Sequence, residues 1–353
     1  MDILTAGGIV AFPTETVYGL AACPTVPGAL DRLDAVKGRP GAKPYTLHIH
    51  DPNQLFHYVP EPPWLAKVLA KKGWPGPITL VVALTEEQAV HARSRFAQDY
   101  DKFFHDNTIG LRCPSHPVAA RLLAHCPLPV VAPSANPAGE APAWDADHVR
   151  KFFSAKEVDL LLDAGPTRFR GSSTVVKVGG PNLQILRVGA LDPSAIDRLA
   201  RFTILFVCTG NTCRSPMAAG LCRKILVDSL SCREEQLADF KITVESAGTS
   251  AASGIGPSPQ AVEAMRTFSI DLASYRSRPV SADLVNRADV IFAMTAEHKD
   301  FICRLVPGAC DRVQLLSRDK PVTDPLGQPT SAYIGCAQWL QDLVRDRLEE
   351  LFQ

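Results

Sequence analysis

The chain has 353 residues, a length that predicts two domains at roughly 100–200 residues per domain. Apolar residues make up 46% and charged residues 21%, which is the composition of a globular protein and disfavours intrinsic disorder. Basic and acidic residues both number 37, so the formal net charge is zero. This balance disfavours a protein that binds nucleic acid through bulk positive charge.

The start of the chain and its cysteines indicate the compartment. Residues 1–4 (MDIL) have neither the basic region nor the apolar run of a secretion signal, and no stretch approaches the 18 apolar residues of a membrane span. Ten cysteines are spread along the chain without a CxxC pair. We therefore expect a cytoplasmic protein that does not contact membranes, has mostly reduced thiols and lacks a structural zinc site.

Short apolar runs alternate with helical segments through the first half of the chain. An apolar run bounded by glycine or proline predicts a buried strand, and such runs lie at 7–12, 78–84, 128–132 and 172–178. Helices are expected at 27–37, 116–125 and 145–154. Strands that alternate with helices predict an α/β layer fold.

Hydroxyl and cationic side chains stand near the ends of these strands. The first strand is followed by Thr14 and then by a loop with two cations, and later strand ends repeat the pattern with Thr108, Arg112, Ser134, Asn136 and Ser173. Such groups suit a polyanion such as a nucleotide triphosphate. The sequence has no Walker loop, no GxGxxG after a strand and no kinase signature, so the nucleotide site must be of a less common kind.

In this order, the motifs resemble the YrdC-type threonylcarbamoyl-AMP synthase family over residues 4–191. That family joins L-threonine, bicarbonate and ATP into threonylcarbamoyl-AMP and releases pyrophosphate, and the product feeds the modification of adenosine 37 in certain tRNAs. The resemblance implies a YrdC-like α/β twisted open sheet, ATP as a substrate with Mg²⁺, and hand-over of the product to a tRNA threonylcarbamoyl transferase. It leaves open a contact with double-stranded RNA or tRNA.

The resemblance also assigns roles to single residues. Lys37 and Arg39 are expected to hold the triphosphate and the developing charge. The residues expected to line the nucleotide pocket are Thr108, Ser134, Asn136 and Arg187, and those expected to hold threonine are Thr14, His48, Arg112 and Ser173, with Arg112 facing the threonine carboxylate. His48 stands between Leu47 and Ile49, so a packed core histidine remains an alternative there. No acidic pair stands out, so no metal ligand is predicted.

The sequence predicts a domain boundary near residue 190. Residues 185–191 (ILRVGAL) predict a last strand, and 192–201 predict a short helix in which Asp192 caps the N-terminus and Pro193 takes the first position. We expect a first domain at 1–191, a linker at 192–202 and a second domain at 203–353.

The alternation restarts in the second half. Strands are expected at 203–207, 242–248 and 288–294, and helices at 215–230, 258–268 and 331–351. Strand, loop and helix in this order predict a doubly wound, mainly parallel sheet.

The sharpest motif of the chain is VCTGNTCRSP at 207–216, which follows an apolar strand and opens a helix. Loop N–H groups and the helix N-terminus there favour an anion, and Arg214 can hold two phosphate oxygens. Cys208 starts the loop, so we expect its pKa to be lowered and its thiolate to be the nucleophile, with Ser215 donating a hydrogen bond to it. Such a reaction needs a general acid, and Asp324 in the loop 323–327 is the candidate.

These residues resemble the low-molecular-weight protein tyrosine/arginine phosphatase family over 203–353. The resemblance rests on the Cys208 loop and on Ser246-Ala247-Gly248-Thr249, Arg276-Ser277-Arg278, 288–295 with His298, and Asp324-Pro325. It implies a phosphocysteine intermediate on Cys208, a leaving group protonated by Asp324 and a phosphoryl group held by Arg214. Asn211 would brace the loop, and no cofactor is implied.

Two departures bear on the substrate, which we expect to be a phosphorylated protein. Phosphotyrosine-specific members carry aromatic residues after the Asp-Pro, where this chain has Leu326 and Gly327. Position 212 is a threonine instead of a larger aliphatic residue, which resembles the protein-arginine phosphatase branch. The hypothesis is phosphoarginine over phosphotyrosine, with Thr212 as a determinant.

Three further cysteines are interpreted separately. Cys213, beside the nucleophile, could form a reversible disulfide on oxidation, or be an ordinary loop cysteine. Cys303 and Cys310 are spaced as in arsenate-reducing relatives but fall within and after a helix, so a structural role is expected for both.

The sequence therefore predicts a bifunctional enzyme. One alternative makes the first domain a non-catalytic RNA- or nucleotide-binding module attached to a tyrosine phosphatase. Another makes it a carbamoyl-phosphate-dependent hydrogenase-maturation module, but the acylphosphatase and zinc-finger segments of such modules are missing from the sequence.

Overall fold

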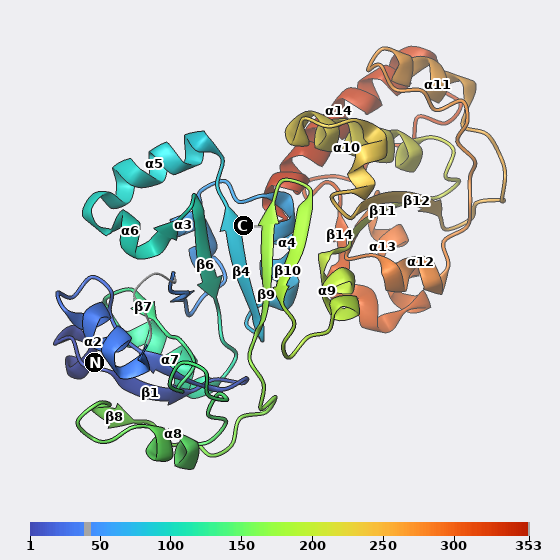
Figure 1. Cartoon of the computed structure of the whole chain (residues 1–353). Helices are drawn as coiled ribbons and strands as arrows, with labels where there is room; N and C mark the ends of the chain where they lie inside the picture. The colour runs from blue at the N-terminus through green and yellow to red at the C-terminus, as the bar shows by residue number, and fades with distance from the viewer. Residues whose placement is uncertain (39–43, 352–353) are drawn as a thin grey trace. The chain divides into compact units, whose positions relative to one another are not determined.

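The computed structural model describes residues 1–38 and 44–351. It divides into two compact units, Met1–Ala200 and Arg201–Gln353, which are described one at a time (Figure 1). Among the described residues, no helix has the length and apolar character that crossing a membrane requires.

The larger sheet of the first unit is mixed. Its strands run in the order β10-β9-β4-β6-β3-β7 over the described residues, with β5 added beside β6. The bounds are β3 Leu47–His48, β4 Ile78–Ala83, β5 Phe104–His105, β6 Thr108–Arg112, β7 Val130–Val131, β9 Thr174–Gly179 and β10 Asn182–Arg187. The central pair β4 and β6 is antiparallel, whereas β4 with β9 and β3 with β6 are parallel. This pairing places the ends of β3 and β6 side by side at His48 and Arg112.

A smaller sheet in the same unit has the order β2-β1-β8 (β1 Val10–Pro13, β2 Tyr18–Ala21, β8 Leu160–Leu161). Single bridges from Gly19 to Ser134 and from Ala22 to Val131 connect it to the segment around β7. All residues of β1 and β2 are buried, as their apolar sequence predicts. The two sheets therefore meet where the polar loops after β1 and β7 lie.

The helices of the first unit cover these sheets. They are α1 Asp2–Thr5, α2 Ala29–Lys37, α3 Gln54–Tyr58, α4 Trp64–Gly73, α5 Glu86–Phe96, α6 Tyr100–Phe103, α7 Pro117–His125, α8 Ala146–Phe152 and α9 Pro193–Ala200. Helix α9 packs on α4, with Ile196 fully buried. Asp192 accepts a hydrogen bond from the Ala195 N–H at 2.7 Å, as expected of an N-cap. The segment expected to be a linker is thus mostly helix, and that helix lies in the first unit.

The second unit is built on an all-parallel sheet. Its order over the described residues is β12-β11-β13-β14 (β11 Phe202–Cys208, β12 Ile242–Gly248, β13 Val290–Ala293, β14 Val313–Leu315). Leu205 and Val207 of β11 share a buried cluster with α12 Ala282–Arg287 and α13 Ala296–Leu305. On the other face, α10 Arg214–Leu230 packs on β11 and β12 and contacts α14 Thr330–Glu350, which also meets α11 Pro259–Arg266. Helices on both faces confirm the doubly wound prediction.

The α/β class is confirmed in both halves, and several element bounds agree with the sequence. The predicted strand 242–248 coincides with β12, and the helices predicted at 215–230 and 331–351 begin one residue earlier in the structure. The predicted last strand, 185–191, is wrong in its bounds, since β10 covers Asn182–Arg187. In the parallel sheet, strand order reverses around β11, and the carboxyl end of such a strand is where ligands of doubly wound folds bind. Cys208 is the residue at that end.

Candidate active sites

The loop between β11 and α10 forms a buried polar site in the second unit. Cys208 is 2% exposed, and its Sγ lies 3.0 Å from Ser215 Oγ and 3.3 Å from the Asn211 N–H. Asn211 takes a left-handed backbone (φ +55°), which asparagine tolerates better than most residues. Its side-chain amide donates to Ser215 Oγ at 2.8 Å. The loop therefore surrounds the sulfur with donors.

Arg214 begins α10, is buried, and is ion-paired with the Asp324 carboxylate. The same guanidinium donates to the Val322 carbonyl at 3.0 Å and to Thr209 Oγ1 at 3.3 Å. The structure thus brings together the predicted phosphate-binding arginine and the predicted general acid, which are far apart in the sequence. Asp324 is 40% exposed, so it stands at the mouth of the site.

The expected lowering of the Cys208 pKa is not found. Burial raises the pKa of the thiol, and the hydrogen bonds from Ser215 and the loop N–H groups and the charge of Arg214 oppose that increase only in part. The Arg214 guanidinium is also ion-paired with the Asp324 carboxylate.

Other residues of this loop have different surroundings. Thr212 is half-buried, and its carbonyl accepts a hydrogen bond from the Ser258 N–H at 3.0 Å. Leu326, directly after the Asp-Pro, is 65% exposed. Cys213 Sγ lies 3.3 Å from Ser258 Oγ and 3.6 Å from the Tyr333 hydroxyl. The redox role of Cys213 stays a prediction.

Sequence reasoning missed two side chains that contact this loop. His298 was noted without a role, and its Nε2 lies 2.9 Å from Thr209 Oγ1. Burial and then the nearby Arg214 lower the pKa of His298. Tyr275 was not considered, although its hydroxyl donates to Asn211 Oδ1 at 2.6 Å. A tyrosine beside Arg276-Ser277-Arg278, a motif already noted, was the only available signal.

Eight of the ten cysteines, Cys208 and Cys213 among them, are free thiols. Cys303 and Cys310 form a disulfide that joins α13 to the 3₁₀ turn Pro307–Arg312. Cys303 packs against the core cluster of the second unit. Both are remote in sequence from the Cys208 loop, and their contacts agree with a structural role.

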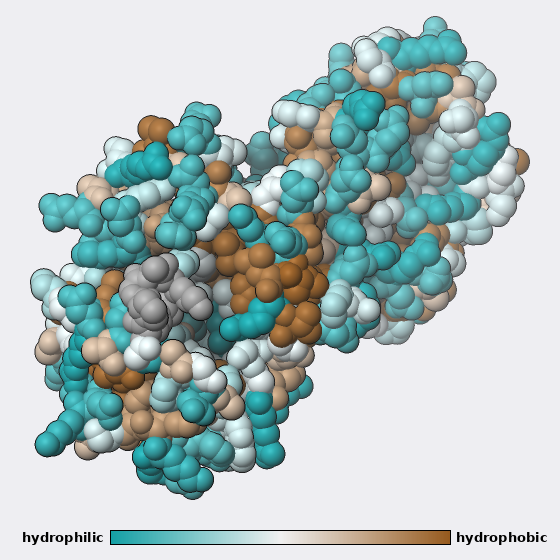
Figure 2. Space-filling model, in the orientation of Figure 1, coloured by the Kyte–Doolittle hydropathy of each residue, from teal (hydrophilic) through white to brown (hydrophobic). Residues whose placement is uncertain are grey.

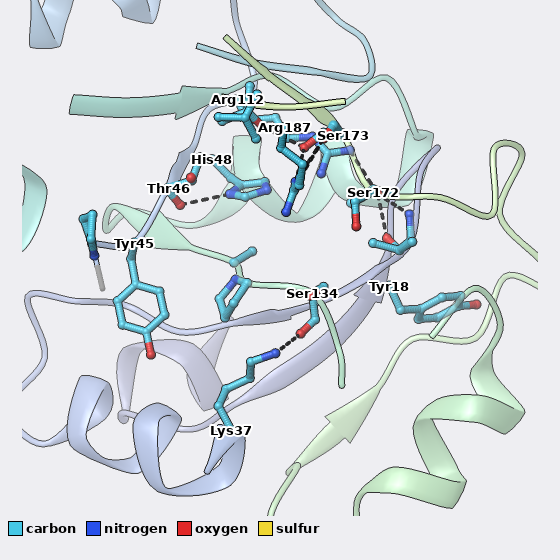
Figure 3. Close-up of a pocket in the computed structure, with 18 residues that line it drawn as sticks. Tyr18, Lys37, Tyr45, Thr46, His48, Arg112, Ser134, Ser172, Ser173 and Arg187 are labelled. Atoms are coloured by element: carbon cyan, nitrogen blue, oxygen red, sulfur yellow. Dashed lines mark hydrogen bonds between the residues drawn. The ribbon is translucent and has the colours of Figure 1, made fainter. Parts of the chain in front are cut away.

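A second polar site occupies the first unit, between its two sheets. It is a cavity of about 240 Å³. Its described lining includes seven of the predicted residues: Thr14, Lys37, His48, Arg112, Ser134, Ser173 and Arg187. Figure 3 places Lys37 and Ser134 on one side of the cavity and Arg112, Arg187 and Ser173 on the opposite side. Three cations thus face one small space, which suits an anionic ligand.

Three predicted residues are not among that lining. Arg39 lies outside the described residues. Thr108 begins β6, and its hydroxyl donates a hydrogen bond to the His105 carbonyl. Arg112 ends the same strand, four residues or about 13 Å away. Asn136 is buried, and its side-chain amide donates hydrogen bonds to the carbonyls of Pro137 and Glu140 in the same loop. The backbone carbonyl of Asn136 accepts a hydrogen bond from Lys37.

Arg112 is already held by this chain. Its Nη2 donates hydrogen bonds to Glu15 at 2.8 Å, to Thr16 Oγ1 at 2.6 Å and to Thr14 Oγ1 at 3.2 Å. The side chains of Arg112 and Glu15, which form an ion pair, are both buried. Its Nε is buried without a hydrogen-bond partner. Glu15 is therefore a structural partner that orients the arginine toward the cavity that Arg112 lines.

His48 faces the same cavity as a neutral side chain. Its Nδ1 lies 3.1 Å from the Thr46 carbonyl, which can only accept, so Nδ1 carries the proton and Nε2 is an acceptor. Burial, followed by the charge of Arg112, lowers the pKa of His48 to about 3. His48 is packed in the core and also lines the cavity. Its side chain is 6% exposed and its ring lies edge-on to Phe12.

The described residues offer no group of three or more His, Cys, Asp or Glu side chains that would hold a metal ion. Two acidic residues contact the described lining: Glu15 is paired with Arg112, and Asp34 accepts a hydrogen bond from the Tyr45 hydroxyl at 2.6 Å. The side chains present therefore do not form a magnesium site of their own, and no chemical step is assigned to such an ion.

Comparison with known proteins gives two family matches. The family model Sua5/YciO/YrdC, described as telomere recombination, matches residues 2–189, and the model of the low molecular weight phosphotyrosine protein phosphatases matches 203–352. Threonylcarbamoyl-AMP synthase of Pyrococcus abyssi is 36% identical over 193 residues, and that of Bacillus subtilis is 33% identical over 195. Each alignment covers 55% of this chain and 54% of the relative, so the chain spans about half the length of these relatives.

Among solved structures, a YwlE arginine phosphatase from Geobacillus stearothermophilus is 34% identical. The match covers 42% of this chain and 92% of that chain, with a TM-score of 0.37.

Proposed function

The chain belongs to the Sua5/YciO/YrdC family through residues 2–189 and carries a low-molecular-weight phosphatase domain at 203–352, and on this basis we propose that it is a bifunctional enzyme. The first domain makes threonylcarbamoyl-AMP, and the second is a cysteine-dependent protein phosphatase. The observation that carries the proposal is that each half encloses its own anion-binding site, around Lys37 and around Cys208.

The cavity of the first domain supports the synthase half. Lys37, with Arg39 by family resemblance, holds the triphosphate, and the cations opposite stabilise charge on the leaving pyrophosphate. The Arg112 guanidinium and the acceptor Nε2 of His48 hold the threonine, taking its carboxylate and its hydroxyl. The threonine amine adds to bicarbonate with loss of water to give a carbamate. The carbamate oxygen attacks the α-phosphorus, and the bond to the pyrophosphate breaks.

Release of pyrophosphate that depends on threonine tests this half. With ATP, bicarbonate and a magnesium salt, the full chain is expected to release pyrophosphate only when L-threonine is added, and Lys37→Ala to lose at least about tenfold of that rate. Lys71→Ala on α4 is the matched control, a lysine outside the cavity lining. No release at all would support a non-catalytic nucleotide- or RNA-binding module instead, and release without threonine would reject threonine as the substrate.

The Cys208 site supports the phosphatase half. When the substrate enters, Arg214 leaves the Asp324 carboxylate to hold the phosphoryl oxygens. The Cys208 thiol loses its proton and Asp324 takes one up, so the reaction starts from a thiolate and a carboxylic acid. The thiolate attacks phosphorus, and Asp324 gives its proton to the leaving group as the old bond breaks. Asp324 then takes a proton from water, which attacks the phosphocysteine. Orthophosphate leaves and the thiolate is restored.

Phosphoarginine is the proposed substrate over phosphotyrosine. Thr212 narrows the loop with a half-buried, branched side chain, and the residue after Asp324-Pro325 is the exposed Leu326 rather than an aromatic that would stack on a phenyl ring. The guanidinium of phosphoarginine needs hydrogen-bond partners more than a ring contact.

Paired kinetics test this preference. The full chain is expected to turn over phosphoarginine with kcat/KM at least about tenfold above phosphotyrosine, with Cys208→Ser as the blank. Thr212→Ile and Leu326→Tyr should each move that ratio toward phosphotyrosine. Leu305→Tyr, another exposed leucine of the second unit, is the control for adding an aromatic residue. Equal turnover of both substrates by the unaltered chain would overturn the preference.

The proposed setting follows from the two reactions. The synthase product passes to a tRNA threonylcarbamoyl transferase, the phosphatase acts on a phosphorylated protein, and both belong in a reducing cytoplasm where Cys208 stays a thiol.

A further inference from the structure

Cys23 and Cys126 bring two free thiols into contact in the first unit, although they stand 103 residues apart in the sequence. Their sulfur atoms are separated by 3.7 Å, a distance at which one thiol donates a hydrogen bond to the other. Among the free cysteines of the described residues, this is the pair whose sulfurs are in such contact. Because bonded sulfurs are about 2 Å apart, a small movement of the two side chains is enough to join them.

The two cysteines differ in exposure. Cys23 is fully buried, whereas Cys126 is half-buried and forms the C-cap of α7. Cys23 belongs to an apolar cluster with Leu122 and Leu123 of that helix, and Cys126 packs against the same cluster. A small dissolved oxidant can therefore reach the sulfur of Cys126 first. Redox-sensitive cysteines are often arranged in this way, with one accessible thiol and a second thiol next to it that completes a disulfide.

The contact between the thiols also makes Cys126 the more reactive of the two. The hydrogen bond from Cys23 lowers the pKa of Cys126, an effect that burial opposes and the Leu128 N–H supports. The same hydrogen bond, together with burial, raises the pKa of Cys23. The thiolate is the form that reacts with oxidants, so the negative charge is placed on the accessible sulfur.

This pair lies beside a backbone contact between the two sheets. Ala22, the residue before Cys23, exchanges two hydrogen bonds with Val131 of β7, at 3.1 and 2.9 Å. Gly19 and Ser134 form a second bridge of this contact, and both line the cavity. A covalent bond from Cys23 to the end of α7 therefore restrains the segment after β2 next to the contact that supports the cavity.

We propose that Cys23 and Cys126 are a site of reversible oxidation, at which hydrogen peroxide converts the two thiols into a disulfide that links the segment after β2 to the end of α7. The Cys126 thiolate attacks one peroxide oxygen, and the O–O bond breaks to give a sulfenic acid and hydroxide. The hydroxide takes up the proton that Cys126 had lost and becomes water.

Cys23 completes the reaction. Its sulfur attacks the sulfenic sulfur, the S–O bond breaks, and the Cys23 proton leaves with the departing hydroxide as a second water. The two thiols lose two electrons, and one peroxide is reduced to two waters. A dithiol reductant reverses the change by thiol–disulfide exchange.

A peptide map of the full chain tests the proposal without any substrate. The reduced protein is treated with hydrogen peroxide at a dose that oxidises the exposed Met1, then unfolded with iodoacetamide present, digested and analysed by mass spectrometry. We expect loss of alkylation at both cysteines, a new peptide that joins Cys23 to Cys126 in the monomeric chain, and recovery of both thiols with dithiothreitol. The oxidised first unit should melt about 5–10 °C higher than the reduced one.

Two substitutions sharpen the test. Cys126→Ser should leave Cys23 open to alkylation after peroxide treatment and abolish the rise in melting temperature. Cys113→Ser is the matched control, because Cys113 is another fully buried thiol of the first unit, and burial raises its pKa to about 12. This variant should form the same link as the unaltered chain.

Full alkylation of Cys23 and Cys126 after the peroxide treatment would overturn the proposal and leave the two thiols a packing contact. An oxidised Cys126 that never joins Cys23, or a link to another cysteine or another chain, would overturn it as well. If Cys126→Ser does not fold, the map of the unaltered chain and of Cys23→Ala still decides. Neither proposed activity enters the measurement, so the loss of either one leaves this test intact.

Discussion

At the scale of single residues, charged side chains of both sites are held by ion-pair partners that the sequence does not predict. Arg214 is paired with Asp324, and Arg112 with Glu15, in each case across a long stretch of chain. These pairs decide how much positive charge is available to an incoming anion. Asp324 is exposed at the mouth and can leave, whereas Glu15 is buried and stays.

Removing the Asp324 charge is expected to change the two properties of the phosphatase site in opposite directions. In Asp324→Asn, turnover should fall about 10²–10⁴-fold because the general acid is lost. Alkylation of Cys208 by iodoacetamide near pH 6 should become several-fold faster, because the full charge of Arg214 then lowers the pKa of the thiol. Slower or unchanged alkylation would contradict the role given to the ion pair.

His48 is expected to make the first unit less stable in acid. Its pKa in the fold, about 3, lies below the value near 6.5 of an unfolded histidine. The unfolded chain therefore takes up the extra proton first, and stability present above pH 6.5 is lost as the pH falls, with a slope approaching about 1.4 kcal/mol per pH unit. Urea unfolding between pH 7.5 and pH 4.5 measures it. His48→Gln should flatten the slope, and His91→Gln, exposed on α5, should not.

At the scale of elements, the Cys208 loop depends on how closely the end of β12 approaches it. A Cβ on Gly248 would collide with the Thr209 carbonyl oxygen and come within 2.9 Å of the Asn211 nitrogen. The loop between β11 and α10 is therefore packed against bare backbone, which requires glycine at this position.

Gly248→Ala is expected to displace the loop and lower phosphatase kcat/KM by at least about tenfold, since misplacing reacting groups by about 1 Å costs up to 10²-fold. Gly256→Ala, where an added Cβ meets nothing within 4 Å, is the matched control and should keep full activity. Steady-state kinetics on both variants check this. Equal activity would mean that the loop tolerates the displacement.

Sequence reasoning succeeded where a motif is contiguous. The loop 207–216 carries the nucleophile, its anion-binding arginine and its serine within one turn, so its geometry follows from the strand and helix on either side. Short strands such as β3, with two residues, have no periodicity to detect. Thr108 lies at the opposite end of β6 from Arg112, and the sequence alone does not distinguish the two ends of a strand. Tyr275 was missed because its partner, Asn211, comes from a different loop.

At the scale of the whole molecule, each unit contributes its own polar side chains to its proposed reaction. The cavity lining named above comes from residues before 188, and the Cys208 cluster from residues after 207. The reason for joining two reactions in one chain is not contained in either site.

The two activities should therefore be separable by single substitutions. Cys208→Ser is expected to abolish phosphatase turnover and leave threonine-dependent pyrophosphate release within about twofold, and Lys37→Ala to do the reverse. Loss of both activities in either variant, with the fold intact by circular dichroism, would show that the reactions are coupled.

The most direct test of two enzymes in one chain is a single ³¹P NMR time course. The purified full chain is mixed with phosphoarginine, ATP, bicarbonate, L-threonine and a magnesium salt. We predict that the phosphoarginine signal is replaced by orthophosphate, while ATP gives pyrophosphate and a new phosphodiester-range adenylate signal that fails to form without threonine. If only orthophosphate forms, the synthase function is rejected, and if only pyrophosphate and the adenylate form, the phosphatase function is rejected. An unchanged spectrum would contradict both functions.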